Sequence, residues 1–443
     1  MRIDKVIRGA KPFTDAEAPA LDIGVSGERI GAILPAGELD ALGAEVIDAH
    51  GLEAAPGFID AHVHPIHNET PGSVGRAAPL GGVTTEGLHL YPEDGESYAA
   101  AMDRLASGVA EGVADAIAHL RITPDRVAEG LRAAVAAGVS TVKVFLAHGD
   151  PTIRSSLGDL ARVMMEAASH RLPVIVHAEL GETIDTVDSL RPPSSEPLSL
   201  TGLSESRPAH MEAAAVSVAA STAALTGARL YLAHVSNREA LDRALEARKA
   251  GADVVVESCP HYLFLTAASA EHLGGLGRVL PPLREAGDQR FLRRAVAEGW
   301  IDVLGSDHCG HAPGVKRRED VAGSGSGLPG IELLGPLLID AALRGEWTDR
   351  TAVVRVLCAN AARVFGLARK GALDVGKDAD VVLIDPAATT VVDASRHLAA
   401  TTYSPYDGRR LQGAITTVLR RGETVVRDGR ALSDRGGELL RTK

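Results

Sequence analysis

The stretch Gly57-Phe-Ile-Asp-Ala-His-Val-His64 is a short apolar run that ends in two histidines, and it is the first of eight such runs. Stretches rich in Ala, Leu and Arg, with the composition of helices, separate the runs. Continuous apolar runs separated by helices are typical of buried parallel strands. Eight strand–helix units over roughly 300 residues fit a closed (β/α)8 barrel better than an open sheet. The predicted strands cover residues 57–64, 83–90, 114–122, 141–147, 173–178, 230–235, 253–259 and 302–306.

Both ends of the chain have a different pattern, in which short alternating segments are punctuated by Gly, Pro and Asp. Such segments are typical of strands in a small sheet. They lie at residues 3–7, 21–25 and 29–34 and again at 380–384, 413–420 and 423–427. The shared pattern predicts one β structure assembled from both termini. We therefore divide the α/β chain into residues 1–53, a barrel over 54–369, and residues 370–443.

Composition and charge exclude several classes of protein. The 443 residues are 45% hydrophobic and 23% charged, which is ordinary for a globular chain. With 46 basic and 58 acidic residues the net charge is −12, which argues against a nucleic-acid-binding surface. Three cysteines are too few for a disulfide scaffold, and neither a signal-peptide run nor a membrane-spanning apolar stretch is visible. We expect a cytoplasmic protein with no membrane contact.

Ionisable side chains stand at the C-terminal ends of five predicted strands, where barrel enzymes gather their chemistry. Residues two apart on a strand share a face, so His62 and His64 can reach one ion. Neutral imidazoles and a carboxylate suit zinc, although manganese, cobalt or iron remain open. Five such ligands exceed one tetrahedral site with an open position, which indicates two metals. The side chains are His62, His64, Lys143, His177, His234 and Asp307.

Lys143 is the unusual member of this group, because two dications would repel a buried ammonium. Two interpretations resolve this. A neutral Lys143 amine could form a Schiff base with a carbonyl substrate. Alternatively, the amine could react with carbon dioxide to give a carbamate, an anion that bridges two metals. The carbamate is the preferred hypothesis, since it removes the repulsion and supplies the bridging anion.

The motifs around these residues resemble those of the cyclic amidohydrolases in the amidohydrolase superfamily, which include hydantoinases (dihydropyrimidinases), allantoinases and dihydroorotases. The match covers nearly the whole chain, in order and at the family's spacing. Besides residues 57–64, it consists of Gly81-Gly-Val-Thr-Thr85, Val142-Lys-Val-Phe-Leu-Ala147, Val176-His-Ala-Glu179, Ala233-His-Val-Ser236, Glu257-Ser-Cys-Pro-His-Tyr-Leu263, Pro281-Pro-Leu-Arg284, Gly305-Ser-Asp-His-Cys309, Gly327-Leu-Pro-Gly-Ile-Glu332, Asn360-Ala-Ala-Arg-Val-Phe-Gly366 and Gly376-Lys-Asp-Ala-Asp-Val-Val-Leu383.

This resemblance implies a (β/α)8 barrel with a small β-sandwich formed by both termini, and a homotetramer or homodimer. It implies that one metal is held by His62, His64 and Asp307, and the second by His177 and His234. Carboxylated Lys143 and a hydroxide would bridge the two ions. The implied reaction is hydrolytic opening of a cyclic amide or imide, in which Asp307 takes the hydroxide proton and passes it to the leaving ring nitrogen.

The substrate ring stays open, because the chain departs from each named member of the group. Dihydroorotases carry an Arg where this chain has Ile66, and an Asn where it has Leu280, so a charged partner for a substrate carboxylate is missing there. Hydantoinases place an oxyanion-donating Tyr where this chain has His148. His148 can also donate a hydrogen bond and is the second candidate catalytic residue. A Schiff-base lyase and a non-catalytic scaffold are the competing hypotheses.

Overall fold

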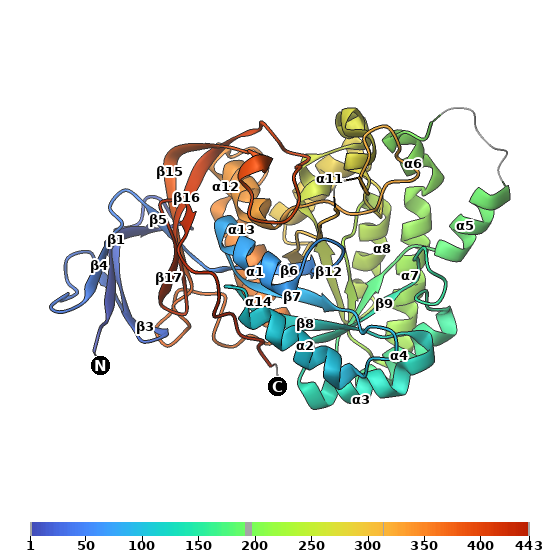
Figure 1. The fold of residues 1–443 in the computed structure, drawn as a ribbon, viewed down its shortest axis with the longest axis horizontal. Coiled ribbons are helices and arrows are strands. Elements are labelled where there is room, and N and C mark those ends of the chain that lie inside the picture. Colours follow the sequence, from blue (N-terminus) through green and yellow to red (C-terminus); the bar gives the residue numbers. More distant parts are fainter. Residues whose placement is uncertain (1, 191–196, 313, 442–443) are drawn as a thin grey trace.

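The computed structural model describes residues 2–190, 197–312 and 314–441. All eight predicted barrel strands are present, and consecutive strands pair in parallel from β13 round to β6. The strands are β6 (Phe58–His64), β7 (Val83–Leu90), β8 (Asp115–Arg121), β9 (Thr141–Phe145), β10 (Val174–His177), β11 (Leu230–Leu232), β12 (Val254–Ser258) and β13 (Val303–Leu304). The barrel is the large unit in Figure 1, and the α/β prediction is confirmed.

The eighth strand is interrupted, and its second piece pairs with the first strand and so closes the barrel. The prediction extended it over residues 302–306, but β13 ends at Leu304. The chain pairs again as β14 (His308–Cys309), which lies parallel to β6. Gly305 packs against His62 so closely that an added Cβ would lie 2.6 Å from the His62 Cβ. The break between β13 and β14 therefore lets Asp307 leave the ladder beside the first strand.

Helices follow the barrel strands and cover the outside of the sheet (Figure 1). Their starts are capped in the usual way: Ser97, Ser156 and Asn237 each accept a hydrogen bond from a backbone N–H of the first turn. The helices are α1 (Pro71–Ala77), α2 (Tyr98–Ala110), α3 (Val127–Ala137), α4 (Leu157–Ser169), α5 (Gly181–Leu190), α6 (Leu200–Ser206), α7 (Ala209–Thr226), α8 (Arg238–Lys249), α9 (Pro260–Phe264), α10 (Ala267–Ala270), α11 (Ala286–Ala297), α12 (Leu334–Arg344), α13 (Arg350–Val354) and α14 (Asn360–Val364). No helix of the described segments is long and apolar enough to cross a membrane.

Both termini build the second unit, as predicted. β1 pairs with β2 and β4 along its first half and with β5 at its end, and β5 pairs with β15 from the other end of the chain. Apolar side chains from both groups of strands form one small core, which includes Ile7, Ile23, Ile30, Val381 and Leu383. The strands are β1 (Lys5–Pro12), β2 (Leu21–Ser26), β3 (Arg29–Pro35), β4 (Glu45–Asp48), β5 (Glu53–Pro56), β15 (Val381–Val391), β16 (Arg410–Arg420), β17 (Glu423–Arg427) and β18 (Arg430–Ala431). The domain boundaries at residues 53/54 and 369/370 stay predictions.

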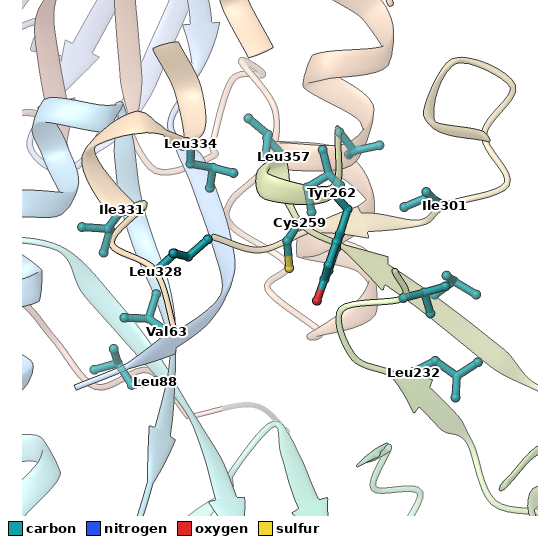
Figure 2. Packing of buried hydrophobic residues seen from close by; sticks show 14 of the residues in the cluster. Val63, Leu88, Leu232, Cys259, Tyr262, Ile301, Leu328, Ile331, Leu334 and Leu357 are labelled. Atoms are coloured by element: carbon teal, nitrogen blue, oxygen red, sulfur yellow. The ribbon is translucent and has the colours of Figure 1, made fainter. Parts of the chain in front are cut away.

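Two apolar layers fix the barrel strands in place. Inside the barrel, Ile117, Ile175, Tyr231 and Val255 pack on one another and on Phe365, so the lower interior is filled. Outside, a larger cluster lies between strands and covering segments; Figure 2 shows Val63 and Leu88 beside Leu328 and Ile331. Each fully buried side chain of this size contributes about 1.5–3 kcal/mol. Polar side chains at the upper ends of the strands are thus held on a rigid base.

Candidate metal centre

Three of the predicted ligands converge between the first and last strands of the barrel. The Nε2 atoms of His62 and His64 lie 3.0 Å apart, and Asp307 Oδ1 lies 3.0 Å from His64 Nε2 and 3.3 Å from His62 Nε2. Asp307 adopts a left-handed backbone conformation with φ of 49°. Such strained conformations cluster at functional sites, where the surrounding structure holds them.

His177 and His234 form a second group beside the first. His177 Nδ1 lies 3.1 Å from His234 Nε2, and their rings meet edge to face. The His234 ring centroid is 5.4 Å from that of His62, so the two groups are neighbours. His234 Nδ1 is buried without a hydrogen-bond partner among the described residues.

Lys143 lies on β9 and is fully buried. Its Nζ has no hydrogen-bond partner in the described part of the chain and lies 5.0 Å from the centre of the Phe145 ring. Burial lowers the pKa of Lys143 to about 8, because the ammonium form is poorly solvated there. A minor fraction of the amine, about a tenth at one pH unit below this pKa, is therefore neutral and available to react.

A buried carboxylate orients ligands of both groups. Glu257, on β12, accepts a hydrogen bond from the His234 backbone N–H at 2.9 Å and one from the Tyr231 hydroxyl at 2.6 Å. His62 Nδ1 lies 2.8 Å from the same carboxyl group. With Nδ1 donating to Glu257, His62 Nε2 keeps its lone pair for a cation. Carboxylate partners of this kind fix the tautomer and orientation of metal-ligating histidines.

His177 has its own partner. Its Nε2 lies 2.9 Å from Glu179, and Arg207 donates two hydrogen bonds of 3.1 Å to the same carboxylate. Burial alone would raise the pKa of Glu179, but the bond to His177 and the charge of Arg207 together lower it to about 2. Glu179 therefore stays ionised and directs the other ring nitrogen, Nδ1, toward His234.

The donor set fits divalent transition metals. Imidazole nitrogens and a carboxylate oxygen lie as close together as the ligands of a single metal ion. This proximity costs energy unless a cation lies between them. The unpartnered nitrogens of Lys143 and His234 give the same indication. A cavity of about 610 Å³ opens above these groups, and its lining includes His64, Arg121, His148, His234 and Asp307. The site is therefore accessible to a small molecule.

Comparison with known protein families matches residues 54–425 of the sequence to the amidohydrolase family. The chain belongs to the amidohydrolase family. It is 33% identical to an allantoinase from Rubrobacter xylanophilus, over 99% of this chain and 97% of the relative. It is 34% identical to a dihydroorotase from Halobacterium salinarum, over 96% of this chain and 98% of the relative. The structure of a D-hydantoinase (dihydropyrimidinase) from Thermus sp. superimposes with a TM-score of 0.92, at 29% identity and 99% coverage of both chains.

His148 lies apart from the predicted ligands of this amidohydrolase, on the cavity wall after β9. Its Nδ1 lies 3.0 Å from the Asp150 backbone nitrogen, whose N–H donates to it in one tautomer, and 3.3 Å from the Asp150 carbonyl oxygen, and its ring meets the edge of Phe145. Burial lowers the pKa of His148, which favours the neutral ring. A neutral ring that accepts at Nδ1 carries its proton on Nε2, so His148 can donate into the cavity.

Sequence analysis missed His89, at the end of the second barrel strand. Its ring centroid lies 4.3 Å from that of His62 and 4.6 Å from that of His64, with the His64 ring stacked on it. Both ring nitrogens are buried without a partner in the described segments. A nitrogen of His89 lies within 4.8 Å of a nitrogen of each of these two ligands. The signal was present, since His89 is the penultimate residue of a predicted strand, as His177 and His234 are of theirs.

Proposed function

We propose that this protein hydrolyses a carbon–nitrogen bond in a cyclic amide or imide, and so opens the ring. The observation that supports this most strongly is Lys143, a buried amine that has no hydrogen-bond partner in the described segments and whose charge acts on histidines of both groups of convergent ligand atoms. The relatives named allantoinase, dihydroorotase and hydantoinase favour a hydrolase of the same class. The substrate would enter the cavity from the C-terminal side of the barrel, where amidohydrolase-type barrels carry their sites.

Two divalent ions, most consistently Zn²⁺, fit the donor set. His62, His64 and Asp307 would hold one ion, and His177 and His234 the other. Bound there, the ions would supply hydroxide at neutral pH and polarise the carbonyl oxygen of the ring. The neutral Lys143 amine would attack the carbon of carbon dioxide, form a nitrogen–carbon bond and release a proton to solvent. The resulting N6-carboxylysine would be an anionic ligand in place of a repelled ammonium.

The protein's own residues would then handle the proton. Asp307 would accept a proton at its carboxylate as the nucleophile attacks and deliver it to the departing ring nitrogen. His148 would donate a hydrogen bond from Nε2 to the carbonyl oxygen as negative charge develops there. Glu257 and Glu179 would keep the histidine rings oriented during turnover.

The test is a ring-opening screen on protein reconstituted with zinc and bicarbonate. Hydantoin, dihydrouracil, allantoin, dihydroorotate and succinimide are followed by chromatography, with the Lys143→Ala variant as the control. We expect one ring class to be opened by the wild type and not by the variant. Two bound metals with no turnover of any ring would contradict the proposal. Borohydride trapping of a substrate on Lys143 would favour the Schiff-base lyase instead.

Asp307→Asn separates proton transfer from metal binding. We expect kcat to fall by about 10²–10⁴-fold, because the amide cannot carry the proton. Some metal should remain bound, since His62 and His64 are unchanged. Metal content and kcat are measured on the same preparation. Normal turnover by Asp307→Asn would exclude Asp307 as the acid–base residue.

Two further predictions concern the setting of this activity. A homotetramer or homodimer is expected by analogy with the cyclic amidohydrolases, and sedimentation of the purified chain tests it. A cytoplasmic location is also predicted, and it agrees with three cysteines that are all buried as free thiols.

A further inference from the structure

Arg121 lies on the wall of the cavity and has no part in the chemistry proposed above. It is the last residue of β8, and it is paired across the parallel ladder with Lys143 of β9. Arg121 lines the same cavity as His64 and Asp307. A guanidinium at this position therefore faces the space that a substrate would occupy.

The guanidinium of Arg121 makes few contacts with the fold. It lies over the Tyr91 ring, its Nη2 makes one long contact of 3.4 Å with the Pro92 carbonyl, and its Nε is buried without a hydrogen-bond partner among the described residues. None of the ion pairs in the described part of the chain involves Arg121. Asp150, a carboxylate whose charge interacts with that of Arg121, is exposed and accepts hydrogen bonds from the backbone and side chain of Thr152.

The other two arginines of the cavity are occupied. Arg207 makes two hydrogen bonds to Glu179. Arg278 donates to the carbonyls of Val321 and Ala322 and to the Ser326 hydroxyl, so it fastens a loop. Arg121 thus differs from both, because its donors remain available to a ligand.

Arg121 is also close to the proposed metal centre. Its guanidinium carbon lies 4.9 Å from the centre of the Tyr91 ring. The Tyr91 hydroxyl in turn lies 2.5 Å from His64 Nδ1. The Tyr91 side chain therefore links the Arg121 guanidinium to a predicted metal ligand, and all three side chains line the same cavity.

We propose that Arg121 is an anion-binding subsite and that the ring opened by this protein carries a carboxylate. This inference rests on the proposed function. A guanidinium binds a carboxylate through two parallel charge-assisted hydrogen bonds, and a half-buried cation without a partner is costly unless a ligand supplies the charge. Ile66 and Leu280 remove the charged partner at the positions that dihydroorotases use. Arg121 supplies a charged partner from a different strand. The substrate carboxylate would therefore be attached at a different place around the ring than in the substrate of dihydroorotases.

The test compares rings with and without a substituent that carries a carboxylate. With two metals confirmed per chain, kcat/KM is measured on dihydroorotate against dihydrouracil and on 5-carboxymethylhydantoin against hydantoin. We expect the wild type to favour the acidic member of at least one pair by about tenfold or more. Arg121→Gln should reduce that ratio by a similar factor, and Arg121→Lys should retain part of it. Arg278→Gln is the matched control, and its ratio should stay within a few-fold of the wild type.

A preference for the neutral member of both pairs would overturn the inference, as would an unchanged ratio in Arg121→Gln. If no ring is opened, the proposed function fails, and binding then tests Arg121 separately. Orotate and uracil are flat analogues that are compared by calorimetry on the metal-loaded protein. Tighter binding of orotate that is lost in Arg121→Gln supports the subsite. Equal affinities for orotate and uracil, or an orotate preference that persists in Arg121→Gln, contradict it.

Discussion

Two buried lysines at opposite ends of the barrel differ in one respect, the presence of a partner. Lys370 is 5% exposed and donates to Asp115 at 2.9 Å and to Asp380 at 2.7 Å. Lys143 is 0% exposed and has no hydrogen-bond partner in the described segments. Although burial opposes it, the pKa of Lys370 is raised by the two carboxylates, whereas burial lowers the pKa of Lys143 to about 8.

The difference separates a structural charge from a functional one. Asp115 begins β8 and Asp380 precedes β15, so Lys370 joins the bottom of the barrel to the terminal strands. At the top of the barrel, no carboxylate of the described residues is hydrogen-bonded to Lys143, and Glu257 and Asp307 act on its charge only from farther away. A fold retains an unpaired buried amine at a cost, and perturbed groups of this kind mark functional sites. The same substitution, Lys to Met, should therefore have opposite consequences at the two positions.

Lys143→Met should have the largest effect, and it should fall on activity. We expect kcat/KM to drop by about 10³-fold or more, because the anionic ligand and one metal are lost. The free energy of unfolding of the metal-free protein should stay the same or rise, since a buried amine without a partner is replaced by an apolar side chain of similar shape. Kinetics and denaturant unfolding measure the two effects.

A large loss of stability in metal-free Lys143→Met would break the comparison, because it would mean that the amine has a structural partner. Retained activity would also break it.

Lys370→Met should affect stability instead. Removing the cation takes from two buried carboxylates their shortest ion pairs and leaves Asp115 with the more distant Arg420 and Arg421. Breaking one partner out of such a buried group costs about 3–5 kcal/mol in the free energy of unfolding. Metal content should remain that of the wild type, because Lys370 lies at the other end of the barrel. Urea unfolding and metal analysis are performed on the same sample. A change in unfolding free energy below about 1 kcal/mol would mean that the ion pairs of Lys370 contribute no more than exposed surface pairs do, which would contradict this prediction.

Glu257→Gln should produce the smallest of these effects, a drop in metal affinity of about 10–100-fold. The amide is a weaker acceptor for His62 Nδ1 than the carboxyl group and cannot hold the histidine tautomer as firmly. Glu212→Gln is the matched control, since Glu212 is equally buried but contacts Arg284, Ser236 and Asn237. Equal losses in both variants would show a general effect of removing a buried charge.

Much of the fold could be predicted from the sequence because buried parallel strands are continuous apolar runs. The pattern located all eight barrel strands and the β structure shared by the termini. It extended the last strand through Ser306, because composition does not reveal that Gly305 packs on His62 and breaks the ladder. The two-residue strands β14 and β18 are too short to leave a pattern of their own.

The candidate site was only partly predictable. The predicted ligands were found because their strands end at one rim, and the structure brings them together there. His89, Glu257 and Arg121 also lie near the ends of predicted strands, but they were passed over since a single strand end does not reveal which side chains lack partners. Partners such as Asp115 for Lys370 come from distant parts of the chain, so only the structure separates a paired charge from an unpaired one.

The central claim, a two-metal centre built around Lys143, is tested most directly by counting metals. Wild-type protein and Lys143→Met are reconstituted with zinc and bicarbonate, desalted and analysed for zinc per chain by mass spectrometry. The account predicts two zinc ions in the wild type, fewer in the variant, and a carbon dioxide adduct on Lys143. Wild-type protein that binds no zinc, or a variant that still binds two, would contradict it.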